Sequence, residues 1–396
     1  MGDCICCTFG RPMRRTRLVL VVAALALGAL PVAGAGAIPP AQADRALDNA
    51  LERLVDGEGG PPGAISMIHR GGRTVAHTAG VGVIQPSRVW RPTDHMRIAS
   101  VAKAFSGAVA LSLVQSGDLE LDDTIGELLP GQPAAWSQVT LRQLLGHTSG
   151  LPDYSGTAAF RRDFGQDLMR RFTPRELLAY SAPEGLNFPP GSRYVYSNSD
   201  NVVAALMAEA ATGRPYERLL RERVYRRLGM RNTSLPQGSR LPRPFAHGYQ
   251  PDPPGQPEDV SEAFSASGAW ASGGIVSTPA DLTRFVRGYV GGRLFAGSVQ
   301  RAQRRMRPGN SEPRGPGVNR AGLALFRYRT RCGVVFGHTG NTGGFTQFIG
   351  ATGDGRRSAT VAINQQITAE VGDARAFARL RRAFAAAVCA ARATRR

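Results

Sequence analysis

A serine and a lysine near residue 100 could together perform nucleophilic catalysis. Lys103 is the only lysine among the 49 basic residues of this 396-residue chain, and Ser100 precedes it by three positions. Residues i and i+3 at the start of a helix share a face, so the two side chains can meet. A desolvated lysine can lose its proton, which arginine does not, and the neutral amine can then activate the serine hydroxyl. Alone, the pair could also be a coincidence of spacing.

A tyrosine and an asparagine further along the chain could join this pair. Tyr196 and Asn198 follow a Pro-Pro-Gly turn at 189–191, in a predicted loop before a helix. The tyrosine oxygen could relay a proton to a leaving amine, and the asparagine amide could bind a substrate carbonyl and the lysine together. The alternative is an ordinary turn with an asparagine helix cap.

A third group lies at the end of a predicted apolar strand, at His338-Thr339-Gly340. Gly340 would let a substrate backbone approach closely, and the strand edge could pair with an extended peptide. The backbone N–H groups of Ser100 and Asn341 could then form an oxyanion hole. The alternative for His338 is a polar surface residue at a strand end.

Together, Ser-x-x-Lys, Tyr-x-Asn and His-Thr-Gly resemble the three motifs of the penicillin-recognising serine hydrolases. Residues 144–151 and 273–278 extend the resemblance over nearly all of the chain after residue 43. That superfamily holds D-alanyl-D-alanine carboxypeptidases, class C β-lactamases, esterases and D-aminopeptidases. This chain looks most like the exported carboxypeptidases that use His-Thr-Gly, which implies a β-lactamase/DD-peptidase-like fold.

The resemblance implies a role for each motif position. Ser100 would attack and form an acyl-enzyme, Lys103 would accept its proton, and Tyr196 would shuttle protons. The residues expected to bind the substrate are Asn198, His338, Thr339, Gly340 and Asn341.

Three further side chains are candidates for the cleft. A terminal carboxylate needs a cation, and Arg327 or Arg329, on one face of the preceding predicted strand, could supply it. Each could equally be a solvated arginine in an arginine-rich chain. Trp270 could line the cleft or fill the core, and we expect His147 to be structural.

The first expectation for function is a serine D-alanyl-D-alanine carboxypeptidase that acts on cell-wall stem peptides and is inhibited by β-lactams. The alternative is a class C-like β-lactamase, a promiscuous esterase or a D-aminopeptidase of the same superfamily. Lactamases of that kind usually carry lysine at the start of the third motif, where this chain has His338. A catalytically inactive penicillin-binding sensor is a third reading, although every expected side chain is present. We expect no cofactor and no metal.

The N-terminus has the pattern of a secretory signal. Arginines at 14, 15 and 17 precede an apolar run over 18–30, which is too short to span a bilayer. We expect a signal peptide over 1–43, cut at Ala41-Gln42-Ala43, with 35–37 as a second candidate site and Met13 as an alternative start. The protein would be secreted, without a membrane span and as a monomer. The formal charge of +19 is spread along the chain without a nucleic-acid-binding motif, so we expect no such partner.

Two cysteines remain after such a cut, Cys332 and Cys389. Outside the cell they could form a disulfide; the alternative is two buried free thiols. The loop of 57 positions (389 − 332) would make the bond worth about 4 kcal/mol in the chain-entropy model. The resemblance supports the pairing, because its carboxypeptidases carry cysteines at similar places.

The elements around these residues predict an α+β fold in one domain over 44–391, with a basic tail at 392–396. An antiparallel sheet of about five or more strands would carry terminal helices on one face and a helical region, 118–285, inserted over the other. The expected strands are 64–69, 74–79, 322–329, 333–337, 344–350 and 358–364. The expected helices include 43–56, 101–115, 140–145, 200–211, 278–289 and 373–391.

Overall fold

A computed structural model describes residues 39–251 and 257–394. Most of the predicted signal peptide, including Met13, lies outside the described residues, as does the end of the predicted tail. Helix α1 (Pro40–Val55) begins ahead of the predicted cleavage site, and Ala43 is buried within it. A cut after Ala43 would therefore remove the first turn of this helix, whereas the second candidate site precedes it.

Seven antiparallel strands form the central sheet, in the order β2-β1-β11-β10-β9-β8-β7. The first and last parts of the chain thus build it together, as predicted. Its strands are β1 (Gly63–Arg70), β2 (Arg73–Gly80), β7 (Val318–Ala321), β8 (Phe326–Thr330), β9 (Gly333–Thr342), β10 (Phe345–Ala351) and β11 (Ser358–Ile363). Gly71 and Gly72 make the predicted turn between β1 and β2, both with positive φ.

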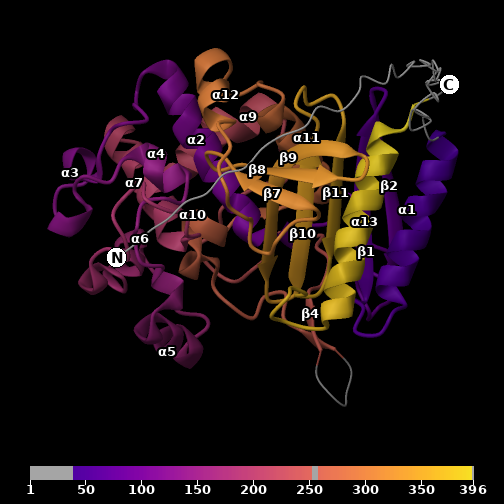
Figure 1. The fold of residues 1–396 in the computed structure, drawn as a ribbon. Coiled ribbons are helices and arrows are strands. Elements are labelled where there is room, and N and C mark those ends of the chain that lie inside the picture. Colours follow the sequence, from indigo (N-terminus) through magenta and orange to yellow (C-terminus); the bar gives the residue numbers. More distant parts are fainter. Residues whose placement is uncertain (1–38, 252–256, 395–396) are drawn as a thin grey trace, which may run out of the picture. The chain divides into compact units, whose positions relative to one another are not determined.

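The two terminal helices pack against each other and against the sheet. Helix α13 (Ala374–Arg392) contacts α1, β1 and β11, and Figure 1 shows α1 and α13 beside each other next to the strands. Apolar side chains of both helices meet strand residues such as Phe348 in one buried cluster. Cys332, in the turn between β8 and β9, is bonded to Cys389 of α13.

The region between the two parts of the sheet is helical, and Figure 1 shows it to one side of the strands. Helix α2 (Ala102–Ser116) is buried over most of its length, because nearly every side chain is apolar or small, and it packs against α7 (Asn198–Thr212) and α10 (Trp270–Gly273). Helix α11 (Pro279–Val290) covers β1, β10 and β11 and is capped by Thr278 as predicted. The fold class is therefore confirmed as α+β.

The remaining elements are short. The helices are α3 (Ile125–Leu128), α4 (Leu141–Leu145), α5 (Ala158–Gln166), α6 (Pro174–Ala179), α8 (Tyr216–Leu219), α9 (Arg226–Leu228) and α12 (Gly297–Gln303). Two small sheets, which we did not predict, pair β3 (Met96–Arg97) with β6 (Val276–Ser277) and β4 (Tyr249–Gln250) with β5 (Glu258–Asp259). No helix in the described residues is long and apolar enough to cross a bilayer.

Two strand predictions were wrong. The segment 322–329 is not one strand, because the chain turns between β7 and β8, where Ala324 has a φ of 48° and Gly322 N–H donates to the Leu325 carbonyl. Strand β9 does not end at Gly337, because β10 pairs with it as far as Thr342. His338 therefore lies inside the strand and not at its end.

Candidate active site

Ser100 lies in a single 3-10 turn, Ala99–Val101, directly before α2, and Lys103 lies in the first turn of that helix. The Lys103 Nζ atom donates a hydrogen bond to Ser100 Oγ over 3.1 Å. Ala99 holds the turn in the left-handed region, with a φ of 45°. The structure therefore brings together the two side chains that the spacing predicted to meet.

The Lys103 amine is enclosed by neutral oxygen atoms. Besides Ser100, it donates to Asn198 Oδ1 over 2.6 Å and to the Ser272 carbonyl over 2.8 Å. Its side chain is fully buried, and this burial lowers the pKa of Lys103 to about 8, although Asp153 opposes the shift through space. The group can therefore lose its proton near neutral pH and act as a base.

Tyr196 covers the lysine. Its ring centre lies 4.9 Å from Lys103 Nζ, and its hydroxyl is buried without a hydrogen bond of standard geometry among the described residues. Burial raises the pKa of Tyr196 well above its usual range, although the Ser100 hydroxyl opposes the shift. The phenol therefore stays protonated and can donate a proton.

Asn198, the first residue of α7, is fixed on its other side by Asp153. Its Nδ2 donates to Asp153 Oδ2 over 2.9 Å and to Ser155 Oγ over 2.8 Å. This leaves Oδ1 aimed at Lys103. Sequence reasoning missed Asp153, although it lies two residues after the 144–151 segment that supported the resemblance.

His147 lies behind Tyr196. Its Nδ1 is 2.8 Å from Asp200 Oδ2, and its ring centre lies 4.5 Å from that of Tyr196. Burial lowers the pKa of His147 to about 3, so the ring is neutral. These contacts fit the structural role that we expected for this histidine.

The third motif lies against the nucleophile at Gly340. A Cβ atom at this position would come within 2.6 Å of the Ile98 carbonyl oxygen and 3.0 Å of the Ser100 amide nitrogen. Only glycine therefore allows β9 to approach the turn that holds Ser100. Asn341 follows, and its side chain accepts a hydrogen bond from Gln366 over 2.7 Å.

One edge of β9 is open beside the nucleophile. Strand β8 pairs only with Gly333–Gly337, while β10 pairs with the other edge as far as Thr342. Within the described residues, the β8-side edge of 338–342 therefore has no strand partner and could pair with an extended substrate.

The side chains of His338 and Thr339 differ from the expectation that they contact substrate. Both are fully buried and neither lines the cavity at Ser100. His338 Nδ1 lies 2.6 Å from the Thr339 carbonyl, and the Thr339 hydroxyl donates to the Pro313 carbonyl over 2.5 Å. Burial lowers the pKa of His338 to about 3. These side chains support the strand and the neighbouring loop.

The candidates for carboxylate binding and for the cleft wall, Arg327, Arg329 and Trp270, do not line the cavity at Ser100. Arg327 pairs with Phe336, four residues before Gly340 (340 − 336), and Arg329 pairs with Val334. At about 3.3 Å per residue, Arg327 lies roughly 13 Å along the sheet from Gly340. Trp270 is buried against Tyr216 and does not line the cavity at Ser100.

The cavity at Ser100 has a volume of about 630 Å³. Ser100, Tyr196, Asn198 and Asn341 line it, together with the aromatic rings of Phe160, Phe164 and Phe264. The charged side chains on its wall are Glu258 and Glu312, and none of the described lining residues is arginine or lysine. The cavity wall therefore combines aromatic rings with two carboxylates and carries no cation among its described residues.

Sequence reasoning missed Glu312 and the Ser272 carbonyl, because a loop carboxylate and a backbone oxygen leave no pattern in a sequence.

Within residues 39–251 and 257–394, no group of three or more His, Cys, Asp or Glu side chains could hold a metal ion.

Comparison with known families identifies the group to which this arrangement belongs. The family model described as Beta-lactamase matches residues 45–384, which include all three motifs. The chain belongs to the beta-lactamase family. It is therefore a member of the penicillin-recognising serine hydrolase superfamily, as the motifs predicted, and its site is that of a serine hydrolase.

Curated relatives in the beta-lactamase family carry several different names. The chain is 28% identical over 224 residues to penicillin-binding protein 4* of Bacillus subtilis (strain 168), covering 53% of this chain and 48% of that protein. It is 30% identical over 234 residues to the D-alanyl-D-alanine-carboxypeptidase/endopeptidase AmpH of Escherichia coli (strain K12), covering 55% of each. A D-aminopeptidase of Cereibacter sphaeroides (strain KD131 / KCTC 12085) is 32% identical over 209 residues, 52% of this chain and 38% of the relative. The matched part of each relative is thus about half of its length or less.

Solved structures of this family match over a larger share of the chain. A D-stereospecific amidohydrolase from Streptomyces sp. has a TM-score of 0.73 and 30% identity, covering 85% of this chain and 97% of that one. A D-amino acid amidase from Ochrobactrum anthropi SV3 has a TM-score of 0.74 and 25% identity, covering 88% of this chain and 97% of that one.

Proposed function

We propose that this protein is a serine amidohydrolase that cleaves the amide bond after an N-terminal D-residue or in a D-amino acid amide, through an acyl-enzyme on Ser100. The observation that carries the substrate preference is the negatively charged cavity wall at Glu258 and Glu312, without arginine or lysine among its described residues. A free amino group is protonated at neutral pH and would be attracted there. The D-configuration is supported by the names of the relatives alone.

The chemistry follows from the contacts of the nucleophile. Neutral Lys103 takes the Ser100 proton as Oγ attacks the acyl carbon, and the oxyanion is held by the N–H groups of Ser100 and Asn341. The protonated Tyr196 hydroxyl gives its proton to the leaving amine, and Lys103 returns one to the phenolate. The ester on Ser100 is then hydrolysed by water, which restores the hydroxyl and releases the acid.

Glu312 is well placed to select the substrate, because its loop is fixed on both sides. The Pro313 carbonyl accepts the Thr339 hydroxyl, and the Asn310 carbonyl accepts the Tyr194 hydroxyl over 2.5 Å. The Glu312 carboxylate is also close enough to raise the pKa of Lys103 through space. An ammonium group bound here would therefore lie near the reacting atoms.

The carboxypeptidase that we first expected fits this cavity less well. Its substrate ends in a carboxylate, and the described cavity wall offers glutamates instead of a cation for that group. Acylation of Ser100 by β-lactams and action on cell-wall peptides remain proposals, supported by the penicillin-binding and carboxypeptidase names among the relatives. We also propose that the protein is secreted and monomeric.

Matched substrates test the proposed function. We expect kcat/KM for D-alanine p-nitroanilide to exceed that for its N-acetyl derivative by about tenfold or more, because acetylation removes the charge. Glu312→Gln should reduce this preference, whereas Glu120→Gln, an exposed change outside the cavity, should not. Preferential release of D-alanine from N-acetyl-D-Ala-D-Ala would overturn the amidase reading in favour of the carboxypeptidase.

A further inference from the structure

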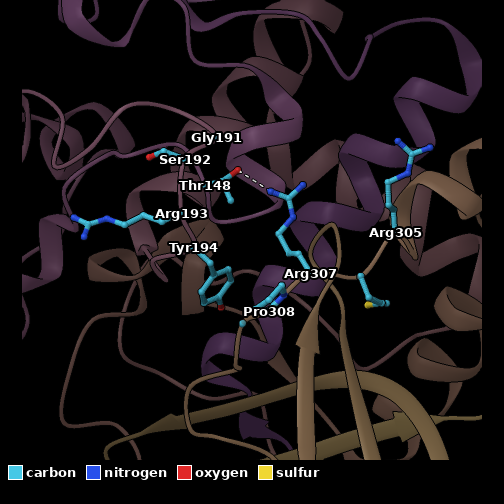
Figure 2. A pocket seen from close by; sticks show the side chains of 10 residues that line it. Thr148, Gly191, Ser192, Arg193, Tyr194, Arg305, Arg307 and Pro308 are labelled. Carbon is cyan, nitrogen blue, oxygen red and sulfur yellow. Dashed lines mark hydrogen bonds between the residues drawn. The ribbon is translucent and has the colours of Figure 1, made fainter. Parts of the chain in front are cut away.

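A second cavity, of about 660 Å³, lies apart from the catalytic one and shares no lining residue with it. Figure 2 shows it between Thr148 and Tyr194 on one side and the segment after α12 on the other. Three arginines line it, Arg193, Arg305 and Arg307, and none of the described lining residues is acidic. The cavity wall therefore carries three positive charges.

None of these arginines forms an ion pair within the described residues. Within the described residues, the Arg307 guanidinium donates only to Thr148 Oγ1, over 3.3 Å, which Figure 2 marks with a dashed line. Arg193 lies over the Phe188 ring at 4.7 Å and reaches the Asn187 carbonyl at 3.5 Å. A guanidinium group has five N–H donors, so most of these donors lack an acceptor among the residues that the structure describes.

Other arginines that are partly or fully buried have close hydrogen-bond acceptors within the protein. Arg97 donates to three carbonyls, at 3.0, 2.6 and 2.9 Å, and Arg88 binds Asp94 at 2.6 Å. Arg307 is half-buried, yet it has one long bond to a neutral hydroxyl. Its donors are therefore available to a ligand, in contrast to those of Arg97 and Arg88.

We propose that this arginine-lined cavity binds a phosphate-bearing anion. Arginine forks match phosphate oxygens, and a ligand with more than one charge suits three guanidinium groups better than a single carboxylate. In Figure 2, Arg307 points toward Thr148, while Arg193 and Arg305 lie on either side of it with their guanidinium groups extending away from it. This spread fits a ligand with successive phosphates, either a free oligophosphate or the phosphodiester chain of an anionic polymer.

Binding of tripolyphosphate to the purified full-length protein tests the proposal, measured by isothermal titration calorimetry at about 150 mM salt, where exposed charges are screened. We expect saturable binding that the triple change Arg193→Gln, Arg305→Gln and Arg307→Gln weakens about tenfold or more. Arg307→Lys keeps the charge but loses the two-pronged guanidinium donor, so its affinity for tripolyphosphate should lie between those of the wild type and the triple variant. A poly(glycerol phosphate) arm distinguishes the sources, since tighter binding of the polymer points to a polymer ligand.

A matched control removes the same charge elsewhere, with Arg45→Gln, Arg73→Gln and Arg231→Gln. These three arginines are exposed and form no ion pair in the described residues. We expect this control to bind within about twofold of the wild type, because long-range attraction is screened. Equal weakening in both triple variants, or no saturable binding to the wild type, would overturn the proposal.

Discussion

At the scale of single residues, the reactivity of Ser100 comes from the surroundings of one lysine. The Lys103 amine has three neutral acceptors and no carboxylate within hydrogen-bonding distance among the described residues. Burial in such a setting costs the charged form more than the neutral form, which lowers the pKa of Lys103 to about 8. An arginine would stay charged at this position, so the only lysine of the chain has a chemical reason to be there.

Replacement of Lys103 by arginine should therefore slow acylation of Ser100 by about 10²- to 10⁴-fold, because the base is lost while the charge is kept. Stopped-flow acylation by a chromogenic ester would measure this. Lys103→Met, of similar length but without an amine, should be slowed in the same range. Acylation within about threefold of the wild-type rate in either folded variant would contradict the base role.

This part of the site could be predicted from the sequence because it depends on local spacing. The turn from Ser100 to Lys103 is a single helical turn, and Tyr196 and Asn198 flank the start of one helix. The Ser272 carbonyl and Glu312 could not be predicted, since their positions depend on how distant loops fold back.

At the scale of elements, the site depends on how closely β9 approaches the turn before α2. Gly340 is the contact point, where a Cβ would lie 3.0 Å from the Ser100 nitrogen. The same approach aligns the open edge of β9 with the nucleophile. Two elements that are far apart in the sequence are thus held at a distance that one methyl group would change.

Gly340→Ala should therefore lower kcat/KM by about 10²-fold, because small displacements of the reacting groups are costly. Gly165→Ala, in α5, is the matched control, since its Cβ would meet nothing within 4 Å. Steady-state kinetics on both variants would show the difference. An unchanged kcat/KM in Gly340→Ala would mean that β9 does not constrain the nucleophile.

The elements themselves were mostly predictable, but their limits at β7, β8 and β9 were not. A local turn at Ala324 occupies the first half of the predicted strand 322–329, which leaves only β8 there, and pairing with β10 extends β9 beyond Gly337. Alternation along β8 placed Arg327 and Arg329 on one face, as the pairing with β9 bears out. It could not reveal how far along the sheet the cavity lies.

At the scale of the whole molecule, buried histidines make the fold sensitive to acid. Burial lowers the pKa of His338 to about 3, whereas the unfolded chain binds a proton near 6.5. Between these values only the unfolded state is protonated, so stability is complete above pH 6.5 and is lost as the pH falls toward 3.

This linkage predicts that, as the pH decreases from 6.5, His338 lowers the free energy of unfolding by up to about 1.4 kcal/mol per pH unit. Urea denaturation at pH 7, 5.5 and 4.5 would measure the slope. In His338→Gln, which cannot titrate at this position, the free energy of unfolding should depend less steeply on pH, because one proton fewer is taken up on unfolding. An identical slope in both proteins would contradict the assignment.

The Cys332–Cys389 disulfide ties the β8–β9 turn to the last helix, across a sequence separation of 57. Replacing both cysteines by alanine should lower the free energy of unfolding by about 4 kcal/mol, because the unfolded chain regains its loop entropy. Denaturant titrations of the oxidised wild type and of the variant would compare them. We expect no free thiol in the denatured, unreduced protein that lacks the predicted signal peptide and with it Cys4, Cys6 and Cys7; two titratable thiols there would refute the bond.

The pH dependence of Ser100 acylation tests the central claim most directly. Intact-mass spectrometry with peptide mapping would follow a D-amino acid ester or a penicillin as it acylates the protein from pH 6 to 10. We predict a single adduct on Ser100 whose rate of formation rises as the pH passes about 8, since only the neutral Lys103 amine accepts the proton. An adduct elsewhere, or a rate on Ser100 that does not change with pH in this range, would contradict the account.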